Sequence, residues 1–233
     1  MVGGALVKRI GLLGGMSWQS SALYYSIINE LVAERLGGFH SADIVMVSVD
    51  FAEIERMQQA GDWEGAGDLL AREAVALELV GAELVVLCTN TMHKVASTIE
   101  AALSVPLLHL GDVTAAAVLA AGIDTVGLLG TRFTMQEPFY RERLEAHGLT
   151  VVLPNPEQQV LVNRVIYDEL VGGIVLDSSR AAYLEIIEGL GAEGVILGCT
   201  EIELLVAQAD TSLPVFPTTR LHAQAAVDAA LAD

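Results

Sequence analysis

Short apolar runs and longer segments of helical periodicity alternate along the whole chain. The apolar runs are rich in Val, Ile and Leu, as buried parallel strands are. They predict strands at 8–13, 43–49, 84–87, 106–109, 125–129, 151–153, 195–197 and 214–216. The segments between them predict helices at 19–36, 62–80, 92–103, 113–121, 136–147, 157–171, 178–190, 202–208 and 219–232. This alternation is typical of crossover connections on parallel sheets, so the predicted fold class is α/β.

The chain also contains an internal repeat. Residues 81–90 (GAELVVLCTN) align without a gap on residues 191–200 (GAEGVILGCT), and two shorter matches occur in the same order, 10–14 with 126–130 and 104–107 with 212–215. The repeat predicts two pseudo-twofold-related lobes, each a roughly four-stranded parallel sheet flanked by helices. The first lobe takes residues 1–105 and 216–233, and the second takes 106–215. Ligands of open α/β sheets bind at the carboxyl ends of strands, so we expect the active site in a cleft between the lobes.

Composition narrows the class of protein. Lys and Arg number 12 against 30 Asp and Glu, and the formal net charge of −18 argues against binding to nucleic acid or to an anionic membrane. Hydrophobic residues make up 53% of the chain, but no apolar run reaches the roughly 18 residues of a membrane span. Glycines interrupt the first apolar stretch too early for a signal peptide. With only two cysteines, a disulfide framework is not expected, and the cytoplasm is the predicted location.

The two cysteines stand in related polar turns. Cys88 and Cys199 each follow a predicted strand and precede a predicted helix, where backbone amides lower the pKa of a thiol and bind carboxylates. The alternative for each is a small core side chain. No CxxC pair and no Cys/His spacing for zinc occurs, so no metal site is predicted. One acid/base group on each side of a cleft suits inversion of a carbon stereocentre, because the proton leaves one face and returns to the other.

Three motifs resemble the cofactor-independent aspartate/glutamate racemase family, and most closely its broad-specificity amino-acid racemase branch. They are IGLLGGMSW (10–18), CTNTMH (88–93) and GCTEIE (198–203), and the similarity continues through 125–135 and 213–216 to His222. The resemblance implies two lobes with the active site between them, an acid/base pair, an amino acid as small-molecule substrate and no pyridoxal phosphate or other cofactor. It also implies a homodimer.

One departure from the family concerns the catalytic pair. Typical members have the first catalytic Cys directly before Asn-Thr, whereas this chain has Thr89 there and Cys88 one residue earlier. The gapless repeat independently places Thr89 opposite Cys199. A one-residue shift along a strand turns a side chain to the other face, so we predict Thr89 and Cys199 as the facing pair, with Cys88 as the rival of Thr89. A hydroxyl is a poor base, and the replacement therefore favours one direction of proton transfer.

A second departure concerns the substrate side chain. Aspartate-specific relatives hold it with a Lys, and the matching position here is Val171. Arg56, Arg132 or Arg164 could supply a cation instead, although each is also a plausible surface charge. Strict selection for aspartate or glutamate is therefore in question, and a more neutral amino acid becomes a candidate.

The remaining polar residues receive roles by position and by resemblance. Ser17 is expected to cap the helix after the Gly14-Gly15 turn and, equally, to help bind the substrate α-carboxylate. The resemblance makes four more residues substrate-binding: Asn90, Thr91, Thr131 and Thr200. Glu201 is expected to orient Cys199, and His93 to serve the first side similarly or to be structural. His222 can return to the site, whereas Tyr24, Tyr25 and Tyr140 are interpreted as packing residues.

The predicted function is two-base deprotonation and reprotonation at the α-carbon of aspartate, glutamate or a more neutral amino acid. A dicarboxylate isomerase or decarboxylase of the same fold is one alternative. A cytoplasmic two-lobed amino-acid-binding protein is another, and a cysteine amidase has only His93 in its favour.

Overall fold

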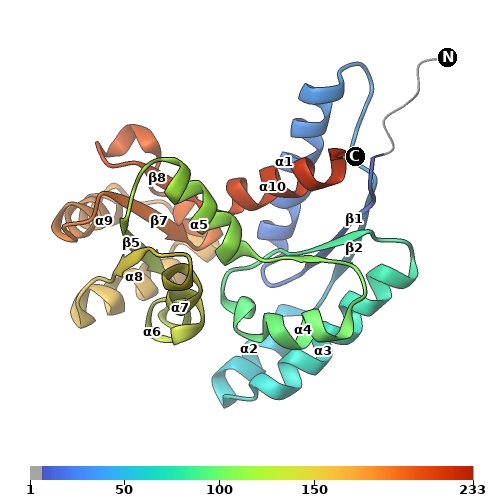
Figure 1. Ribbon diagram of the computed structural model, residues 1–233. Helices are drawn as coiled ribbons and strands as arrows, with labels where there is room; N and C mark the ends of the chain where they lie inside the picture. Colours follow the sequence, from blue (N-terminus) through green and yellow to red (C-terminus); the bar gives the residue numbers. More distant parts are fainter. Residues whose placement is uncertain (1–6, 233) are drawn as a thin grey trace. The chain divides into compact units, whose positions relative to one another are not determined.

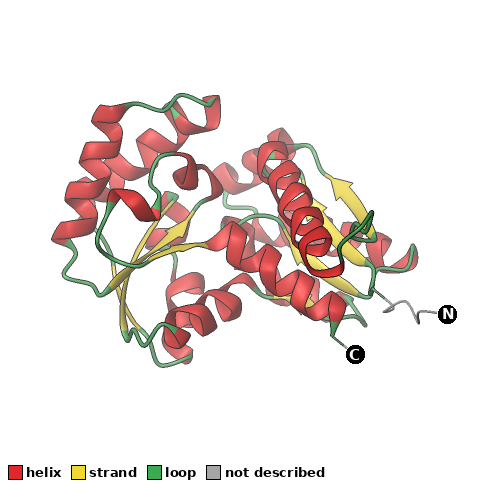
Figure 2. Cartoon of the chain, turned by 90° about the horizontal axis from the view of Figure 1, so that it is seen from above, coloured by secondary structure: helices red, strands yellow, loops and turns green. Residues whose placement is uncertain are grey.

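The computed structural model describes residues 7–232, which form two compact units (Figure 1). The first unit comprises residues 7–109 and 222–232, and the second comprises Leu110–Leu221. Each unit contains one four-stranded sheet whose strands are all parallel. Helices enclose the strands of each sheet (Figure 2). The predicted α/β class, with two parallel four-stranded sheets flanked by helices, is confirmed.

The two sheets have equivalent strand orders. The first is β2-β1-β3-β4 and the second is β6-β5-β7-β8. In the first unit the strands are β1 (Ile10–Gly14), β2 (Ile44–Ser48), β3 (Leu84–Leu87) and β4 (Leu107–Leu108). In the second they are β5 (Thr125–Gly130), β6 (Thr150–Val152), β7 (Gly194–Gly198) and β8 (Val215–Pro217). The repeat seen in the sequence therefore corresponds to a repeated topology, with β1 and β3 matching β5 and β7.

The helices follow the same two halves. The first unit contains α1 (Trp18–Leu36), α2 (Phe51–Ala60), α3 (Trp63–Leu79), the 3-10 helix η1 (Thr91–Val95) and α4 (Ala96–Ala102). The second contains α5 (Leu110–Ala120), α6 (Arg132–Gln136), α7 (Pro138–Ala146), α8 (Pro156–Asp168), η2 (Leu170–Gly172), α9 (Asp177–Gly189), η3 (Thr200–Leu204) and η4 (Gln208–Asp210). The last helix, α10 (Thr218–Leu231), begins in the second unit and continues in the first. No helix within residues 7–232 is long and apolar enough to cross a membrane.

Side chains of the first sheet alternate strictly between two cores. Leu84, Val86 and Cys88 pack with α1 and α10 on one face. Val85 and Leu87 pack with α2, α3 and α4 on the other face. Successive side chains of a strand point to opposite faces, so the residue after Leu87 belongs to the α1/α10 core.

The second sheet divides its side chains in the same way. Val195, Leu197 and Cys199 pack with α8 and α9 on one face. Ile196 packs with α5 and α7 on the other, together with Val126, Leu128 and Phe216. Cys199 therefore continues the row of Val195 and Leu197, whereas in the first sheet the equivalent row is Val85 and Leu87.

All the strands predicted from the sequence are confirmed, with ends that agree to about two residues. Most predicted helices are confirmed as well. The helix expected at 136–147 is α7, which begins at Pro138, and the short helix α6 before it was not predicted. Glu137 adopts an extended conformation (φ −81°, ψ 144°) between α6 and α7. The cause is Pro138, whose ring disfavours helical geometry in the residue before it.

One other helix prediction was wrong, and one further helix was not predicted. The helix expected at 202–208 is the 3-10 helix η3, whose Leu205 N–H donates to the Ile202 carbonyl at 2.9 Å. Both of these side chains are buried, and their spacing of three residues matches the 3-10 period. Helix α2 was not predicted, because half of its residues are polar and its buried residues are Ile54 and Gln58.

The turn after β1 supplies a stability prediction. Gly15 has φ +97°, and a Cβ there would lie 2.2 Å from the carbonyl oxygen of Val49. Gly148 has a similar φ of +92° but nothing within 4 Å of a Cβ. Gly148→Ala should lower the free energy of unfolding by about 1–2 kcal/mol, the cost of left-handed backbone. Gly15→Ala should lower the free energy of unfolding by the same amount and by about a further 1–3 kcal/mol, because the new Cβ overlaps the Val49 carbonyl.

Urea unfolding of both variants beside the wild type checks this difference. Equal losses in the two variants would contradict the steric role of Gly15.

Candidate active site

Polar side chains gather at the carboxyl ends of the two central strands in each unit. We call Ser17, Thr89, Asn90, Thr91 and His93 the first half-site, and Thr131, Cys199, Thr200 and Glu201 the second half-site. All of these residues are buried except Glu201, which is half-buried. The first half-site lies within the first unit and the second half-site within the second unit. The residues of each half-site therefore follow strands of one sheet.

A tight turn after β1 positions Ser17. Gly14 leaves room for Ser21, whose hydroxyl accepts the Gly15 N–H at 2.8 Å and donates to the Ser17 carbonyl at 3.0 Å. Ser17 is the N-cap of α1 and accepts the N–H of Ser20 at 3.3 Å. The predicted capping role is confirmed, and contact with a substrate carboxylate stays a prediction.

The end of β3 separates Cys88 from Thr89. Cys88 is fully buried within the α1/α10 core, and burial raises the pKa of its thiol. Its N–H donates to the Leu13 carbonyl at 2.9 Å, and its carbonyl accepts the Ser20 hydroxyl at 3.1 Å. Thr89 is also buried, at 8% exposed, and its N–H donates to the Leu87 carbonyl at 2.8 Å. Cys88 thus has the surroundings of a packed core residue.

His93 holds the backbone of Thr89. Its Nδ1 lies 2.7 Å from the Thr89 carbonyl oxygen, and because a carbonyl only accepts, Nδ1 carries the proton. Burial, followed by the neighbouring His109 and His222, lowers the pKa of His93 well below its ordinary value. His93 is therefore a neutral imidazole that fixes the turn carrying Thr89.

Two further histidines complete a buried cluster with His93. The ring centroids of His109 and His222 lie 4.8 Å and 5.8 Å from that of His93. His222 donates from Nε2 to the Leu108 carbonyl at 2.7 Å, so its Nδ1 accepts the Tyr24 hydroxyl at 2.9 Å. Burial lowers the pKa of His222 to about 4. The packing role of Tyr24 is confirmed, but its hydrogen bond and the place of His109 were not predicted, since no sequence spacing links them.

The other two tyrosines differ from each other. Tyr140 is buried in the core beneath α5 and α7, as predicted. Tyr25 is 51% exposed, so its interpretation as a packing residue was wrong, because it is on the outer side of α1 next to the buried Tyr24.

The second half-site is built on close contact between β5 and β7. Gly130 pairs with Gly198, and a Cβ on Gly130 would lie 2.9 Å from the Gly198 carbonyl oxygen. Thr131 is the N-cap of α6 and accepts the N–H of Thr134 at 3.3 Å. Glycines on both strands thus bring Thr131 to the same edge as Cys199.

Cys199 is joined to Glu201 and buried beside it. The Cys199 thiol donates to Oε2 of Glu201 at 3.0 Å. Burial, followed by the charge and hydrogen bond of Glu201, raises the pKa of Cys199 well above its ordinary value. The sequence predicted that helix amides lower the pKa of this thiol, but the structure gives the opposite direction. Cys199 precedes only the short 3-10 helix η3, and its thiol faces the carboxylate of Glu201. In the free protein the thiol holds its proton.

Thr200 is fixed from the start of α10. Thr219 donates its hydroxyl to the Thr200 hydroxyl oxygen at 3.1 Å, and Thr218 donates to the Leu197 carbonyl at 2.9 Å. Asn90 and Thr91 lie at the start of η1, also a 3-10 helix. Each polar turn therefore leads into a 3-10 helix, and the one after β3 continues as the expected α-helix, α4.

The candidate cations are on the surface. Arg56, Arg132 and Arg164 are all exposed. Arg132 follows Thr131, and its guanidinium lies 4.9 Å from the ring centroid of Phe133. Val171, the position predicted to match the Lys of aspartate-specific relatives, is in η2, which packs against η3. Within residues 7–232 no group of three or more His, Cys, Asp or Glu side chains has the arrangement of a metal site.

A family model and several known proteins are similar to this chain along nearly its whole length. The family model described as Asp/Glu/Hydantoin racemase matches residues 13–226. A crystal structure from Yersinia pestis, provisionally named an Asp/Glu racemase, is 53% identical, with a TM-score of 0.92 over 97% of this chain and 100% of that chain. An aspartate racemase homologue from Pyrococcus horikoshii is 36% identical, with a TM-score of 0.86 over 96% and 99%. The broad-specificity amino-acid racemase RacX of Bacillus subtilis is 26% identical over 96% of this chain and 98% of its own length.

The buried histidines predict an acid-sensitive fold. Because the folded-state pKa of His222 is about 4 and the unfolded value is about 6.5, the unfolded chain binds more protons between these values. Stability is therefore present above about pH 6.5 and is lost as the pH falls toward 4, by roughly 3 kcal/mol from this group. His222→Gln should lose less free energy of unfolding than the wild type on going from pH 7 to about pH 4.5.

His40→Gln is the matched control, because His40 is exposed. Urea unfolding at the two pH values decides the matter. Identical losses in the wild type, His40→Gln and His222→Gln would show that His222 does not stabilise the neutral-pH fold.

Proposed function

The chain belongs to the Asp/Glu/hydantoin racemase family, and from this we propose that Cys199 and Thr89 exchange the α-proton of an amino acid. The protein is an amino-acid racemase that does not use pyridoxal phosphate. The observation that carries the residue assignment is strand parity. Thr89 follows the row of Val85 and Leu87, and Cys199 continues the row of Val195 and Leu197.

The proposed reaction begins at the second half-site. Cys199 loses its proton to Glu201 and, as thiolate, removes the α-proton of the substrate. The electron pair of the broken C–H bond stays on the substrate as an enediolate-like carboxylate. Thr89 then donates its hydroxyl proton to the other face of the carbon. Glu201 releases the proton it took from Cys199 to solvent, and Thr89 regains one from solvent, so no net proton is gained or lost. Each half-site thus serves one face, as inversion requires.

The enediolate needs stabilisation by groups that are already in place. We assign this role to Ser17, Asn90 and Thr91 from the first half-site, and to Thr131 and Thr200 from the second. Their burial and the hydrogen bonds that fix Ser17, Thr131 and Thr200 support the assignment. Cys88 stays the rival of Thr89, and its position in the core weighs against it.

The proposed substrates are aspartate, glutamate and more neutral amino acids. The segment η2 supports this breadth, since Val171 is 36% exposed and brings no charge next to η3. We also propose that the protein works as a homodimer in the cytoplasm and handles D-amino acids. Light scattering of the purified protein tests the dimer.

Exchange of the α-proton in D2O tests the chemistry. L- and D-amino acids, acidic and neutral, are incubated with the protein without pyridoxal phosphate and followed by NMR. Cys199→Ala should reduce deuterium incorporation by at least about a hundredfold, the scale of a lost general base. Thr89→Ala should cause a comparable loss, whereas Cys88→Ala should retain most activity.

Circular dichroism confirms that each variant is folded. Loss in Cys88→Ala with retention in Thr89→Ala would reverse the assignment. Absence of exchange with every amino acid in the wild type would point to the binding protein or to the dicarboxylate enzyme.

The hydroxyl of Thr89 predicts unequal half-reactions. An alcohol donates a proton more readily than it removes one from carbon, so the enantiomer whose α-proton faces Thr89 should exchange slowly. Thr89→Cys should raise the rate for that enantiomer by about tenfold or more, since a thiol is the stronger acid and forms a usable base. Initial rates from pure L and pure D substrates measure the ratio, with Thr89→Ser as control. A wild-type ratio near one, unchanged in Thr89→Cys, would exclude this asymmetry.

A further inference from the structure

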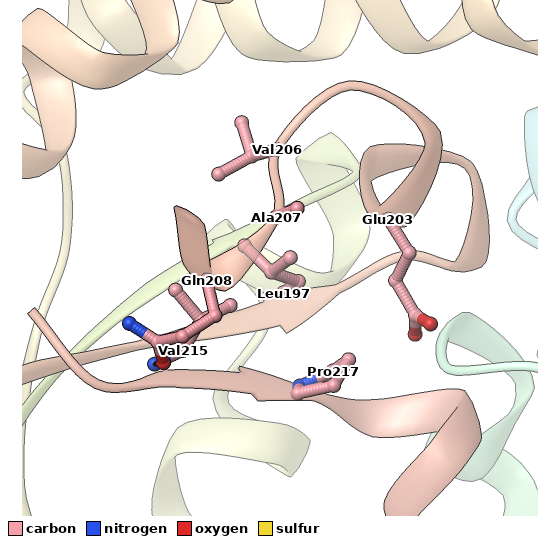
Figure 3. A pocket seen from close by; sticks show the side chains of 7 residues that line it. All are labelled: Leu197, Glu203, Val206, Ala207, Gln208, Val215 and Pro217. Carbon is pink, nitrogen blue, oxygen red and sulfur yellow. Dashed lines mark hydrogen bonds between the residues drawn. The ribbon is translucent and has the colours of Figure 1, made fainter. Parts of the chain in front are cut away.

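Glu203 connects η3 to the first turn of α10. Its carboxylate accepts the Thr219 N–H at 3.0 Å. The first N–H groups of a helix have no partner inside the helix, so Glu203 caps α10. Figure 3 shows the side chain reaching from the turn after β7 toward the junction where β8 runs into α10.

The same helix turn holds both sides of the Cys199 turn. Thr218 bonds the carbonyl of Leu197, two residues before Cys199, and Thr219 bonds Thr200, the residue after it. Glu203 fixes the backbone of Thr219, and the hydroxyl of Thr219 in turn holds Thr200. One carboxylate thus supports the residue next to the proposed base.

The surroundings of Glu203 are mostly apolar. It lines a pocket of about 200 Å³ with Leu197, Val206, Ala207, Gln208, Val215 and Pro217 (Figure 3). The amide of Gln208 is engaged with the backbone, accepting from Val215 at 2.9 Å and donating to Leu213 at 3.0 Å. Glu203 is therefore the ionisable group among the residues that line this pocket.

The negative charge of Glu203 affects the pKa of the Cys199 thiol. Burial raises the pKa of Glu203 to about 7, against the hydrogen bonds from Thr219. Glu201 on η3 raises this pKa further and Arg220 on α10 lowers it. Neither η2 nor β7 nor β8 contributes an ionisable side chain, and Asp210 is engaged by the Ala207 N–H at 2.8 Å. Glu203 in turn raises the pKa of Cys199, after burial and Glu201.

We propose that Glu203 is a positioning residue for the half-reaction at Cys199, holding Thr200 through Thr219 and setting the charge beside the thiol. The proposal rests on the proposed function and adds a residue that does not touch the substrate. Near neutral pH, protonation of Glu203 removes a negative charge from the Cys199 turn and so eases ionisation of the thiol.

Thiol alkylation tests the charge directly. Glu203→Gln keeps an oxygen that can accept the Thr219 N–H but cannot ionise, and Glu188→Gln on the exposed face of α9 is the matched control. Iodoacetamide labelling of Cys199, resolved from Cys88 by peptide mass spectrometry, is followed from about pH 6 to pH 10. Glu203→Gln should label about three to ten times faster at about pH 7.5, as a pKa lowered by up to one unit implies.

The pH profile of α-proton exchange should move with it. In Glu203→Gln the acid limb for the enantiomer that Cys199 deprotonates should shift to lower pH, whereas Glu188→Gln should match the wild type. A merely structural Glu203 would leave both the labelling rate and the limb in place. Coincidence of Glu203→Gln with Glu188→Gln in both measurements would overturn the charge effect.

Thr219 variants test the positioning. Thr219→Val removes the hydroxyl, with its bond to Thr200 and its interaction with Glu203, and keeps the N–H that Glu203 accepts. Thr219→Ser keeps both the hydroxyl and the N–H. The valine variant should lose about tenfold in kcat/KM for exchange, the cost of one hydrogen bond of about 1.4 kcal/mol, and the serine variant should recover it. Equal rates in the two would overturn this part. If the wild type exchanges no α-proton, the proposed function fails, while the labelling rates still decide whether Glu203 acts on Cys199.

Discussion

Alternation of side chains along buried parallel strands is the constraint on which the candidate site depends. Both faces of each sheet are covered by helices, so the apolar side chains of the central strands belong to one core or the other. In the first sheet Cys88 falls in the α1/α10 core with Leu84 and Val86. A shift of one residue would exchange the two faces. The position that matches Cys199 is therefore Thr89, although the chain offers a cysteine directly beside it.

Close backbone contact lets the polar turns occupy the strand ends. Gly14 leaves space for Ser21, and Gly130 lies against Gly198, so a side chain at either glycine would displace a neighbour. Hydrogen bonds then hold each turn to the rest of its own unit. The Ser20 hydroxyl donates to the Cys88 carbonyl, and the Thr219 hydroxyl donates to that of Thr200. Such fixed hydroxyls and amides cost little reorganisation when charge develops on a substrate, which is the condition for electrostatic catalysis.

Much of this arrangement could be predicted from the sequence. The strands, the repeat and the cap at Ser17 follow from local patterns, because apolar runs, glycine spacing and capping residues act over a few positions. The 3-10 turns after β3 and β7 could not be predicted, since their form is decided by burial against the sheet. The partners His109 and Tyr24 were likewise hidden, because only the fold brings them to His93 and His222.

The protonation states at rest bear on how the reaction can start. The thiol of Cys199 keeps its proton and donates a hydrogen bond of 3.0 Å to Glu201. Thr89 is an alcohol. Both members of the proposed pair are thus donors in the free protein, whereas racemisation needs one donor and one base. The alcohol is far too weak an acid to become the base near neutral pH. In the proposed reaction the proton therefore leaves Cys199, and the negative charges of Glu201 and Glu203 oppose its loss by raising the pKa of the thiol.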